Sequence, residues 1–284
     1  MATRLIDIHP HIISPDTQRY PLDPLGGKRS GWSAERPVTF EEYDAAMKAA
    51  GIDKAAIVHS STTYGFDNSY LADAIEGKTD RFAGVYSIDM LADDAEQKMK
   101  YWAGRNMSGL RIFTTGSTMP GQAPWLEDPK LARSWGQAGD MGIPVCVQMT
   151  KAGIPALEKL LQAHPQTIAI IDHMMKPPIA GGPPYAEAQF LFDLARYKNV
   201  YLKFSSRNTE EIWNGKATPE TFLGKVVQEF GADRIAWGSN FPAAEDSLAD
   251  IVAALKRAIA FLPEQDQHWI MAGTAQKLYP TLKD

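Results

Sequence analysis

Two histidines, His9 and His11, stand two residues apart near the N-terminus, directly after the apolar residues Leu5, Ile6 and Ile8. In a β-strand, residues i and i+2 point to the same face, so we expect both imidazoles to project into one cavity. Neighbouring imidazoles can bind a divalent metal, polarise a carbonyl group or transfer a proton. The pair therefore marks a candidate catalytic site.

Other polar residues follow apolar runs at the point where each run ends. His59 and His173 do so, which gives four of the six histidines this position; His164 and His268 fall in or beside expected helices and are predicted to lie at the surface. Further strand-end residues are Arg111, Gln148, Lys176, Ser205, Arg207 and Asn240. If the strand ends meet, these side chains form one site.

The elements that must position these residues alternate regularly along the chain. Strand-like apolar runs are expected at 5–8, 55–58, 82–88, 109–113, 144–147, 168–171, 200–204 and 235–237. Amphipathic helices are expected at 40–50, 93–103, 129–141, 154–163, 186–197, 219–230, 247–261 and 265–278. Thr39 and Glu42 have the spacing of a capping box before the first of these helices.

Eight repeats of a buried strand and a helix predict a single (β/α)8 TIM barrel that spans residues 1–284. Residues 12–37 form an unusually long loop after the first strand, on the barrel face that carries active sites. This loop is predicted to be a lid that supplies cationic and aromatic contacts. Its candidate residues are Arg19, Tyr20, Lys28, Arg29 and Trp32.

Composition excludes several classes of function. The net charge is −5, and no cluster of basic residues with interleaved aromatics indicates nucleic-acid binding. Cys146 is the only cysteine and lies in an apolar run, which predicts a buried thiol and excludes an internal disulfide. No apolar run reaches the roughly 20 residues of a membrane span, and no signal peptide precedes Arg4, so we expect a cytoplasmic protein.

Ordered motifs along nearly the whole chain resemble the amidohydrolase superfamily. They are Asp7-Ile8-His9-Pro10-His11, Gly65-Phe66-Asp67-Asn68, Gly109-Leu110-Arg111, Ile171-Asp172-His173-Met174 with Lys176-Pro177, Lys203-Phe204-Ser205, Trp237-Gly238-Ser239-Asn240-Phe241-Pro242 and Gly273-Thr274-Ala275-Gln276-Lys277-Leu278-Tyr279. The chain is most similar to the amidohydrolase-2 group of small metal-dependent-hydrolase-like barrels, and within it to 2-pyrone-4,6-dicarboxylate lactonase-like hydrolases.

This resemblance implies a hydrolase that opens a carboxylate-bearing lactone or related cyclic ester from aromatic or sugar-acid catabolism. His9, His11 and His173 would polarise the carbonyl group, whose oxygen gains negative charge during hydrolysis. The residues expected to bind the small carboxylated substrate are Arg111, Gln148, Lys176, Ser205 and Arg207. Decarboxylation of an aromatic or unsaturated acid, isomerisation of a lactone and ligand binding without catalysis stay open as alternatives.

The chain departs from the resembled family at Asn240, where an aspartate usually takes a proton from the attacking water. An amide has no basic lone pair, so the base must be His59, a neighbouring histidine or metal-bound hydroxide, unless Asn240 is an introduced replacement. The site would use either no cofactor or one divalent ion, Zn or Mn, on His9, His11 and His173. Asp7 and Asp172 are expected to point away from the cavity. A homo-oligomer is compatible with the sequence.

Overall fold

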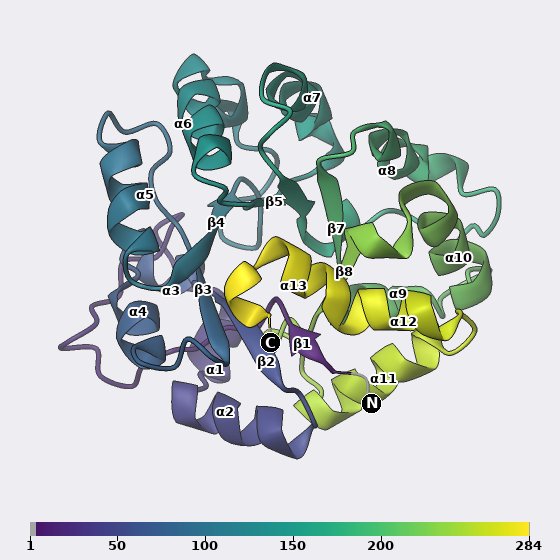
Figure 1. Cartoon of the computed structure of the whole chain (residues 1–284), viewed down its shortest axis with the longest axis horizontal. Coiled ribbons are helices and arrows are strands. Elements are labelled where there is room, and N and C mark those ends of the chain that lie inside the picture. The colour runs from purple at the N-terminus through teal and green to yellow at the C-terminus, as the bar shows by residue number, and fades with distance from the viewer. Residues whose placement is uncertain (1–3, 284) are drawn as a thin grey trace.

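The computed structural model describes residues 4–283 and forms an eight-stranded parallel barrel, as predicted (Figure 1). The strands are β1 (Ile6–Asp7), β2 (Lys54–Val58), β3 (Phe82–Tyr86), β4 (Met107–Phe113), β5 (Val145–Gln148), β6 (Ala169–Ile171), β7 (Val200–Ser205) and β8 (Ile235–Gly238). Each strand pairs in parallel with the next along the chain. The Ile8 N–H donates to the Trp237 carbonyl at 3.1 Å and joins the first strand to the last.

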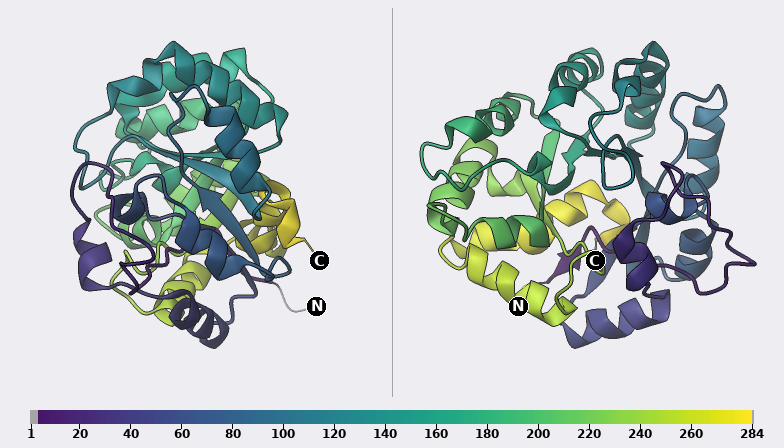
Figure 2. Two further views of the ribbon diagram at one scale, coloured as in Figure 1. Left: turned by 90° about the vertical axis from the view of Figure 1, so that its left-hand side faces the viewer. Right: turned by 180° about the vertical axis from the view of Figure 1, so that it is seen from behind.

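Helices surround the barrel and connect its strands (Figures 1 and 2). The α-helices are α1 (Gly31–Glu35), α2 (Phe40–Ala49), α3 (Ser61–Tyr64), α4 (Ser69–Ile75), α5 (Ala95–Ala103), α6 (Pro129–Asp140), α7 (Ile154–Ala163), α8 (Gln189–Asp193), α9 (Ser206–Glu211), α10 (Pro219–Phe230), α11 (Leu248–Ile259), α12 (Glu264–His268) and α13 (Thr274–Leu278). Shorter turns are η1 (Pro124–Glu127), η2 (Lys151–Gly153), η3 (Asp172–Met175), η4 (Ala186–Ala188), η5 (Leu194–Arg196), η6 (Ala232–Arg234), the π-helical η7 (Trp269–Gly273) and η8 (Pro280–Leu282). None of the helices in residues 4–283 is long and apolar enough to cross a membrane.

Two predicted helices differ from the structure. The segment 186–197 is divided into η4, α8 and η5, and the segment 265–278 contains the π-helical turn η7 between α12 and α13. Apolar spacing alone does not separate an α-helix from short 3₁₀ or π turns, because all of them place an apolar stripe on one side. The predicted capping box is confirmed: Thr39 Oγ1 accepts from the Glu42 N–H at 3.2 Å, and the Glu42 carboxylate accepts from the Thr39 N–H at 2.8 Å.

Alternation along the strands separates an interior layer from an outer layer. Ala56 and Val58 of β2 and Cys146 of β5 belong to the interior cluster, whereas Ala55 and Ile57 pack with the surrounding helices. This period of two decides which polar residues at the strand ends enter the barrel.

The C-terminal segment fills one mouth of the barrel. Figure 1 shows α13 lying across the centre of the strands. Leu278, Tyr279 and Leu282 are buried in the interior cluster, and the Tyr279 hydroxyl lies 3.5 Å from Cys146 Sγ. Cys146 is buried as predicted, and burial raises the pKa of its thiol, as expected for a structural cysteine. The other mouth, at the carboxyl ends of the strands, is left for the site.

Candidate functional site

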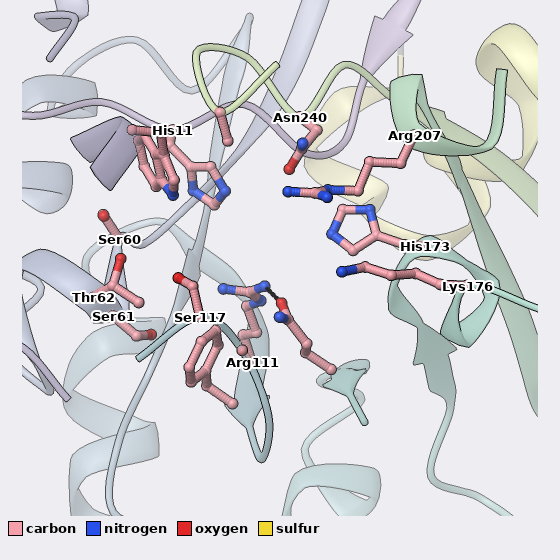
Figure 3. A pocket seen from close by; sticks show the side chains of 15 residues that line it. His11, Ser60, Ser61, Thr62, Arg111, Ser117, His173, Lys176, Arg207 and Asn240 are labelled. Atoms are coloured by element: carbon pink, nitrogen blue, oxygen red, sulfur yellow. Dashed lines mark hydrogen bonds between the residues drawn. The ribbon is translucent and has the colours of Figure 1, made fainter. Parts of the chain in front are cut away.

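A cavity of about 290 Å³ lies at the carboxyl ends of the strands and contains most of the predicted site residues (Figure 3). Its lining comprises His11, Trp32, Ser60, Ser61, Thr62, Arg111, Phe113, Gly116, Ser117, Gln148, His173, Lys176, Arg207, Asn240 and Ala243. His9, His59 and Ser205 are not part of this lining. Figure 3 shows His173, Lys176, Arg207 and Asn240 grouped on one side, with His11 and Ser60 on the other.

His59 does not occupy the position proposed for a catalytic base. Val58 faces the barrel interior, so alternation directs His59 outward and Ser60 into the cavity. The His59 ring is buried, with Nε2 3.0 Å from the Gly65 carbonyl, and burial lowers the pKa of His59 to about 4. The expectation that His59 is the base is therefore not supported by its position.

Asp172 also differs from the expectation, because it points into the barrel. Ile170 faces the interior, and Asp172, two residues later, follows it. His173 would then point outward in a regular strand. It reaches the cavity because residues 173–176 adopt left-handed backbone angles, with φ between 50° and 57°. Four successive non-glycine residues in this region are uncommon and cost conformational energy, which is typical of functional sites.

Asp172 is the centre of a buried charge cluster, in which Lys203 is the residue that the sequence analysis did not assign to the site. Its carboxylate lies 2.7 Å from Lys203 Nζ and 2.8 Å from Arg111 Nε, and the Asp172 and Lys203 side chains are 0% exposed. Burial alone would raise the pKa of Asp172, but Lys203 and Arg111 hold it well below its usual range. A signal was present: Lys203 interrupts an apolar strand, and a lysine buried there requires a counter-charge.

Arg111 and Gln148 both line the cavity, and they form a hydrogen bond with each other. Arg111 Nη2 donates to Gln148 Oε1, and Gln148 Nε2 donates to the Thr115 carbonyl at 3.0 Å. Because Arg111 Nε also donates to the Asp172 carboxylate, the guanidinium is held rigidly in the cavity wall. It presents a fixed positive charge rather than a mobile clamp.

The hydrogen bond of His11 assigns its tautomer. Nδ1 lies 2.8 Å from the Val58 carbonyl oxygen, which can only accept, so Nδ1 carries the proton. Burial and the Arg111 charge lower the pKa of His11 to about 3, so the ring is neutral at neutral pH. Its Nε2 then presents a lone pair. At Nε2 a neutral His11 can accept a proton or bind a metal, but it cannot donate a hydrogen bond to a substrate carbonyl oxygen, which differs from the expectation that its N–H polarises that carbonyl.

A chain of hydrogen bonds assigns the same tautomer to His173. The Ser205 N–H donates to Asn208 Oδ1 at 2.9 Å, and the Ser205 hydroxyl donates to the same oxygen at 3.1 Å. Ser205 Oγ must therefore accept from His173 Nδ1, 2.7 Å away. Burial lowers the pKa of His173 well below its usual value, so its Nε2 also carries a free lone pair. Ser205 orients His173 and does not line the cavity.

His9 lies beneath these two rings, with ring centroids 4.9 Å from His11 and 4.8 Å from His173. Neither of its ring nitrogens has a hydrogen-bond partner among residues 4–283, and Nδ1 is 3.7 Å from Asp172 Oδ1. Burial, with Lys203 nearby, lowers the pKa of His9 well below its usual value. Imidazole nitrogens without a hydrogen-bond partner are suitable ligands for a divalent cation. Within residues 4–283, however, no three His, Cys, Asp or Glu side chains are arranged as a ready metal site.

Asn240 stands at the rim between β8 and the cavity. Its φ of 58° is left-handed, a conformation that asparagine and aspartate tolerate better than most residues. Gly238 brings this segment close to the first strand, because a Cβ at 238 would lie 2.5 Å from the Cβ of His9. The Asn240 side chain is 4% exposed, and its Nδ2 has no partner in the described chain. The buried Nδ2 is therefore an unused hydrogen-bond donor beside the cavity, and Figure 3 shows the amide oxygen nearer to Arg207.

Lys176 and Arg207 are the cations left available in the lining. Neither forms an ion pair or hydrogen bond within the part of the chain that the structure describes. Burial and the neighbouring Arg207 charge lower the pKa of Lys176, and the nearby Glu211 carboxylate offsets only part of this effect. An anionic group bound between them would relieve this repulsion.

The long loop after β1 contributes less charge to the cavity than predicted. Arg19 and Tyr20 both bind Asp73 at the surface, at 2.7 and 2.8 Å. Of the five residues singled out in this loop, only Trp32 lines the cavity, where its ring stacks on His11 with centroids 5.1 Å apart. The loop thus covers the site with an aromatic side chain and not with cations.

Comparisons with known proteins agree with this architecture. The profile of the amidohydrolase family matches residues 6–281. The L-fucono-1,5-lactonase of Burkholderia ambifaria is 28% identical over 213 residues, which cover 71% of this chain and 69% of that protein. The 4-sulfomuconolactone hydrolase of Rhizobium radiobacter is 26% identical over 238 residues, or 83% and 75% of the two chains. A 2-pyrone-4,6-dicarboxylic acid hydrolase structure from Pseudomonas putida superposes with a TM-score of 0.75, 22% identity and full coverage of both chains.

Proposed function

The chain belongs to the amidohydrolase family, and from this premise we propose that it hydrolyses a small lactone that carries at least one carboxylate. The observation that carries the proposal is the cavity itself. Two unpaired cations, Lys176 and Arg207, adjoin two neutral imidazoles with free lone pairs, His11 and His173. Both curated relatives described above are lactone hydrolases, which supports the same reaction class.

The cations would bind the substrate carboxylate and fix the lactone ring between the two imidazoles. Arg207 can form two parallel hydrogen bonds to a carboxylate, whereas Lys176 acts as a point charge. With the carboxylate held there, the ester carbonyl would lie beside the Asn240 amide, whose Nδ2 donor has no partner among the described residues and would turn toward the carbonyl oxygen. Binding energy at the carboxylate is thereby used to orient the reacting group.

In the proposed reaction, Nε2 of His11 or His173 takes a proton from water while the water oxygen bonds to the carbonyl carbon. The negative charge that develops on the carbonyl oxygen is stabilised by the Asn240 amide and by the fixed Arg111 charge. The ring C–O bond then breaks, and the imidazolium returns the proton to the departing alkoxide. Asn240 is thus assigned an electrophilic role in place of the basic role of an aspartate.

A divalent ion, Zn or Mn, remains part of the proposal as an optional component. His9, His11 and His173 would hold it, and it would supply Lewis-acid polarisation of the carbonyl and a more acidic water. Metal analysis of the purified protein, followed by assay before and after chelation, tests this point. We expect turnover of a carboxylated lactone to persist after chelation if the imidazole acts as the base, and to disappear if the ion is required.

The decisive test of the reaction is turnover of a panel of carboxylated lactones, followed by acid release at constant pH. Hydrolysis releases one proton per ester opened, whereas a decarboxylase would release CO2 and an isomerase would yield an isomer without acid. The Asn240→Asp variant is assayed in parallel, because an aspartate there would supply a base. Absence of acid release by both proteins would refute the lactonase proposal.

Substitution of the free cations should separate binding from chemistry. We expect Lys176→Met and Arg207→Met to raise KM for a carboxylated lactone by about 10- to 100-fold with a smaller effect on kcat, because they remove a contact made before and during the reaction. Lys151, which lies outside the cavity, provides a matched control as Lys151→Met. Equal KM values for all three variants and the parent would contradict the assigned carboxylate site.

A further inference from the structure

A second cavity of about 230 Å³ adjoins the first at the carboxyl ends of β3 and β4. Arg111 and Phe113 line both cavities, so the two spaces adjoin at these side chains. Most of the second lining is apolar, with Leu25, Phe66 and Trp125 among its side chains. Phe66 is 43% exposed at its rim, which is unusual for a large aromatic side chain that serves only packing.

The polar groups in this lining are already engaged by the protein. The Ser87 hydroxyl donates to the Arg111 carbonyl at 3.1 Å and lies 3.0 Å from Ser61 Oγ. The Asp89 carboxylate accepts from the Leu91 N–H at 2.9 Å. The Arg111 guanidinium is directed to Asp172 and Gln148, as described above. The second cavity therefore offers apolar contact, and the Asp89 charge disfavours a second carboxylate there.

The long loop after β1 links the two cavities. Its Trp32 lines the first cavity, and its tip, Leu25 and Gly26, lines the second. The tip is anchored to α3 by the Leu25 N–H, which donates to the Ser61 carbonyl at 3.0 Å. It also packs directly on the loop after β4, because a Cβ at Gly26 would lie 2.4 Å from the Thr118 oxygen. One insertion thus covers two adjoining spaces of opposite chemistry.

We infer that the second cavity is a subsite for an apolar substituent on the same substrate whose carboxylate binds at Lys176 and Arg207. This inference rests on the proposed function for the identity of the carboxylate site and extends it to the substrate class. The substrate is amphipathic: a carboxylated head at the imidazoles and a neutral alkyl or aromatic group beyond Phe113. Unsubstituted lactones of small acids would leave the second cavity unfilled.

The inference is tested by direct binding, which does not require turnover. The dissociation constants of ω-phenylalkanoates, from phenylacetate to 5-phenylpentanoate, are measured by calorimetry or ligand-observed NMR and compared with alkanoates of equal chain length that lack the ring. For at least one length we expect the phenyl group to tighten binding about tenfold, because it is removed from water. An equal affinity for every pair would overturn the subsite.

Two variants locate the ring, and a third serves as the matched control. Leu25→Ser and Phe66→Ala should each abolish most of the tenfold advantage, whereas Leu22→Ser should keep it, because Leu22 is 40% exposed in the same loop but lines neither cavity. An advantage that survives both variants would also overturn the inference. If the advantage depends on Leu25 and Phe66 but no lactone is hydrolysed, the subsite stands and the proposed reaction fails.

Discussion

Replacement of Asp172 by asparagine is expected to lower the free energy of unfolding by about 3–5 kcal/mol, because it leaves two buried cations without their counter-charge. Lys203 is fully buried and Arg111 nearly so, and both contact the Asp172 carboxylate within 2.8 Å. An amide of the same shape keeps the packing but removes the charge. Urea denaturation of parent and variant measures the loss.

The matched control is Asp233→Asn, which removes a carboxylate paired with Lys277 at the surface, where both side chains are about 45% exposed. Solvent screens that pair, so its loss should cost less than about 1 kcal/mol. The double variant Asp172→Asn/Lys203→Met should recover part of the loss, since it also removes one uncompensated cation. Equal stabilities of Asp172→Asn and Asp233→Asn would contradict a buried, charged Asp172.

The same carboxylate makes stability depend on pH in a defined direction. The pKa of Asp172 is lower in the folded chain than in the unfolded one, so its contribution is fully present above the unfolded value, about 4. It is lost progressively as the pH falls below that value toward the folded pKa. Denaturation midpoints between pH 7 and pH 3 should therefore fall more steeply for the parent than for Asp172→Asn.

The second large effect is expected on catalysis. His11→Gln and His173→Gln should each lower kcat for a carboxylated lactone by at least about 100-fold, because each removes a lone pair that can accept the proton of water. The variant with the greater loss identifies the base. A shift in KM alone would indicate a binding role for the ring.

His59→Gln is the informative comparison, because His59 is equally buried but its ring does not face the cavity. We expect this variant to keep most of its activity once the folded fraction is measured by circular dichroism. If His59→Gln lost as much activity as His11→Gln, the outward direction assigned to His59 would be wrong.

The barrel could be predicted from the sequence because its strands are nearly continuous apolar runs. Such runs indicate strands covered on both faces, and eight of them with intervening helices leave few alternatives. The boundaries were less well defined: the third strand ends at Tyr86 and not at 88, since regular pairing stops before the chain turns to residues 87–91. Short 3₁₀ and π turns within the outer helices were missed because apolar spacing does not distinguish them from an α-helix.

The direction of individual polar side chains was harder to predict than their common position at the carboxyl ends of the strands. Strand alternation correctly applied from Val58 and Ile170 would have placed Ser60 and Asp172 inside and His59 outside. His173 could not have been placed in this way, because its left-handed backbone breaks the alternation. The tautomers of His11 and His173 depend on a carbonyl and a hydroxyl supplied by distant strands, which no local pattern reveals.

The C-terminal segment, which fills the end of the barrel opposite the site, has a consequence for biosynthesis. A ribosome makes all eight strands before Leu278, Tyr279 and Leu282, which are buried among them. Until these residues emerge, the nascent barrel has an open apolar interior and Cys146 lacks the hydroxyl that contacts it. These residues can therefore pack into the barrel only after all eight strands have been made. A chain arrested before Leu278 should stay bound by chaperones that recognise exposed apolar surface.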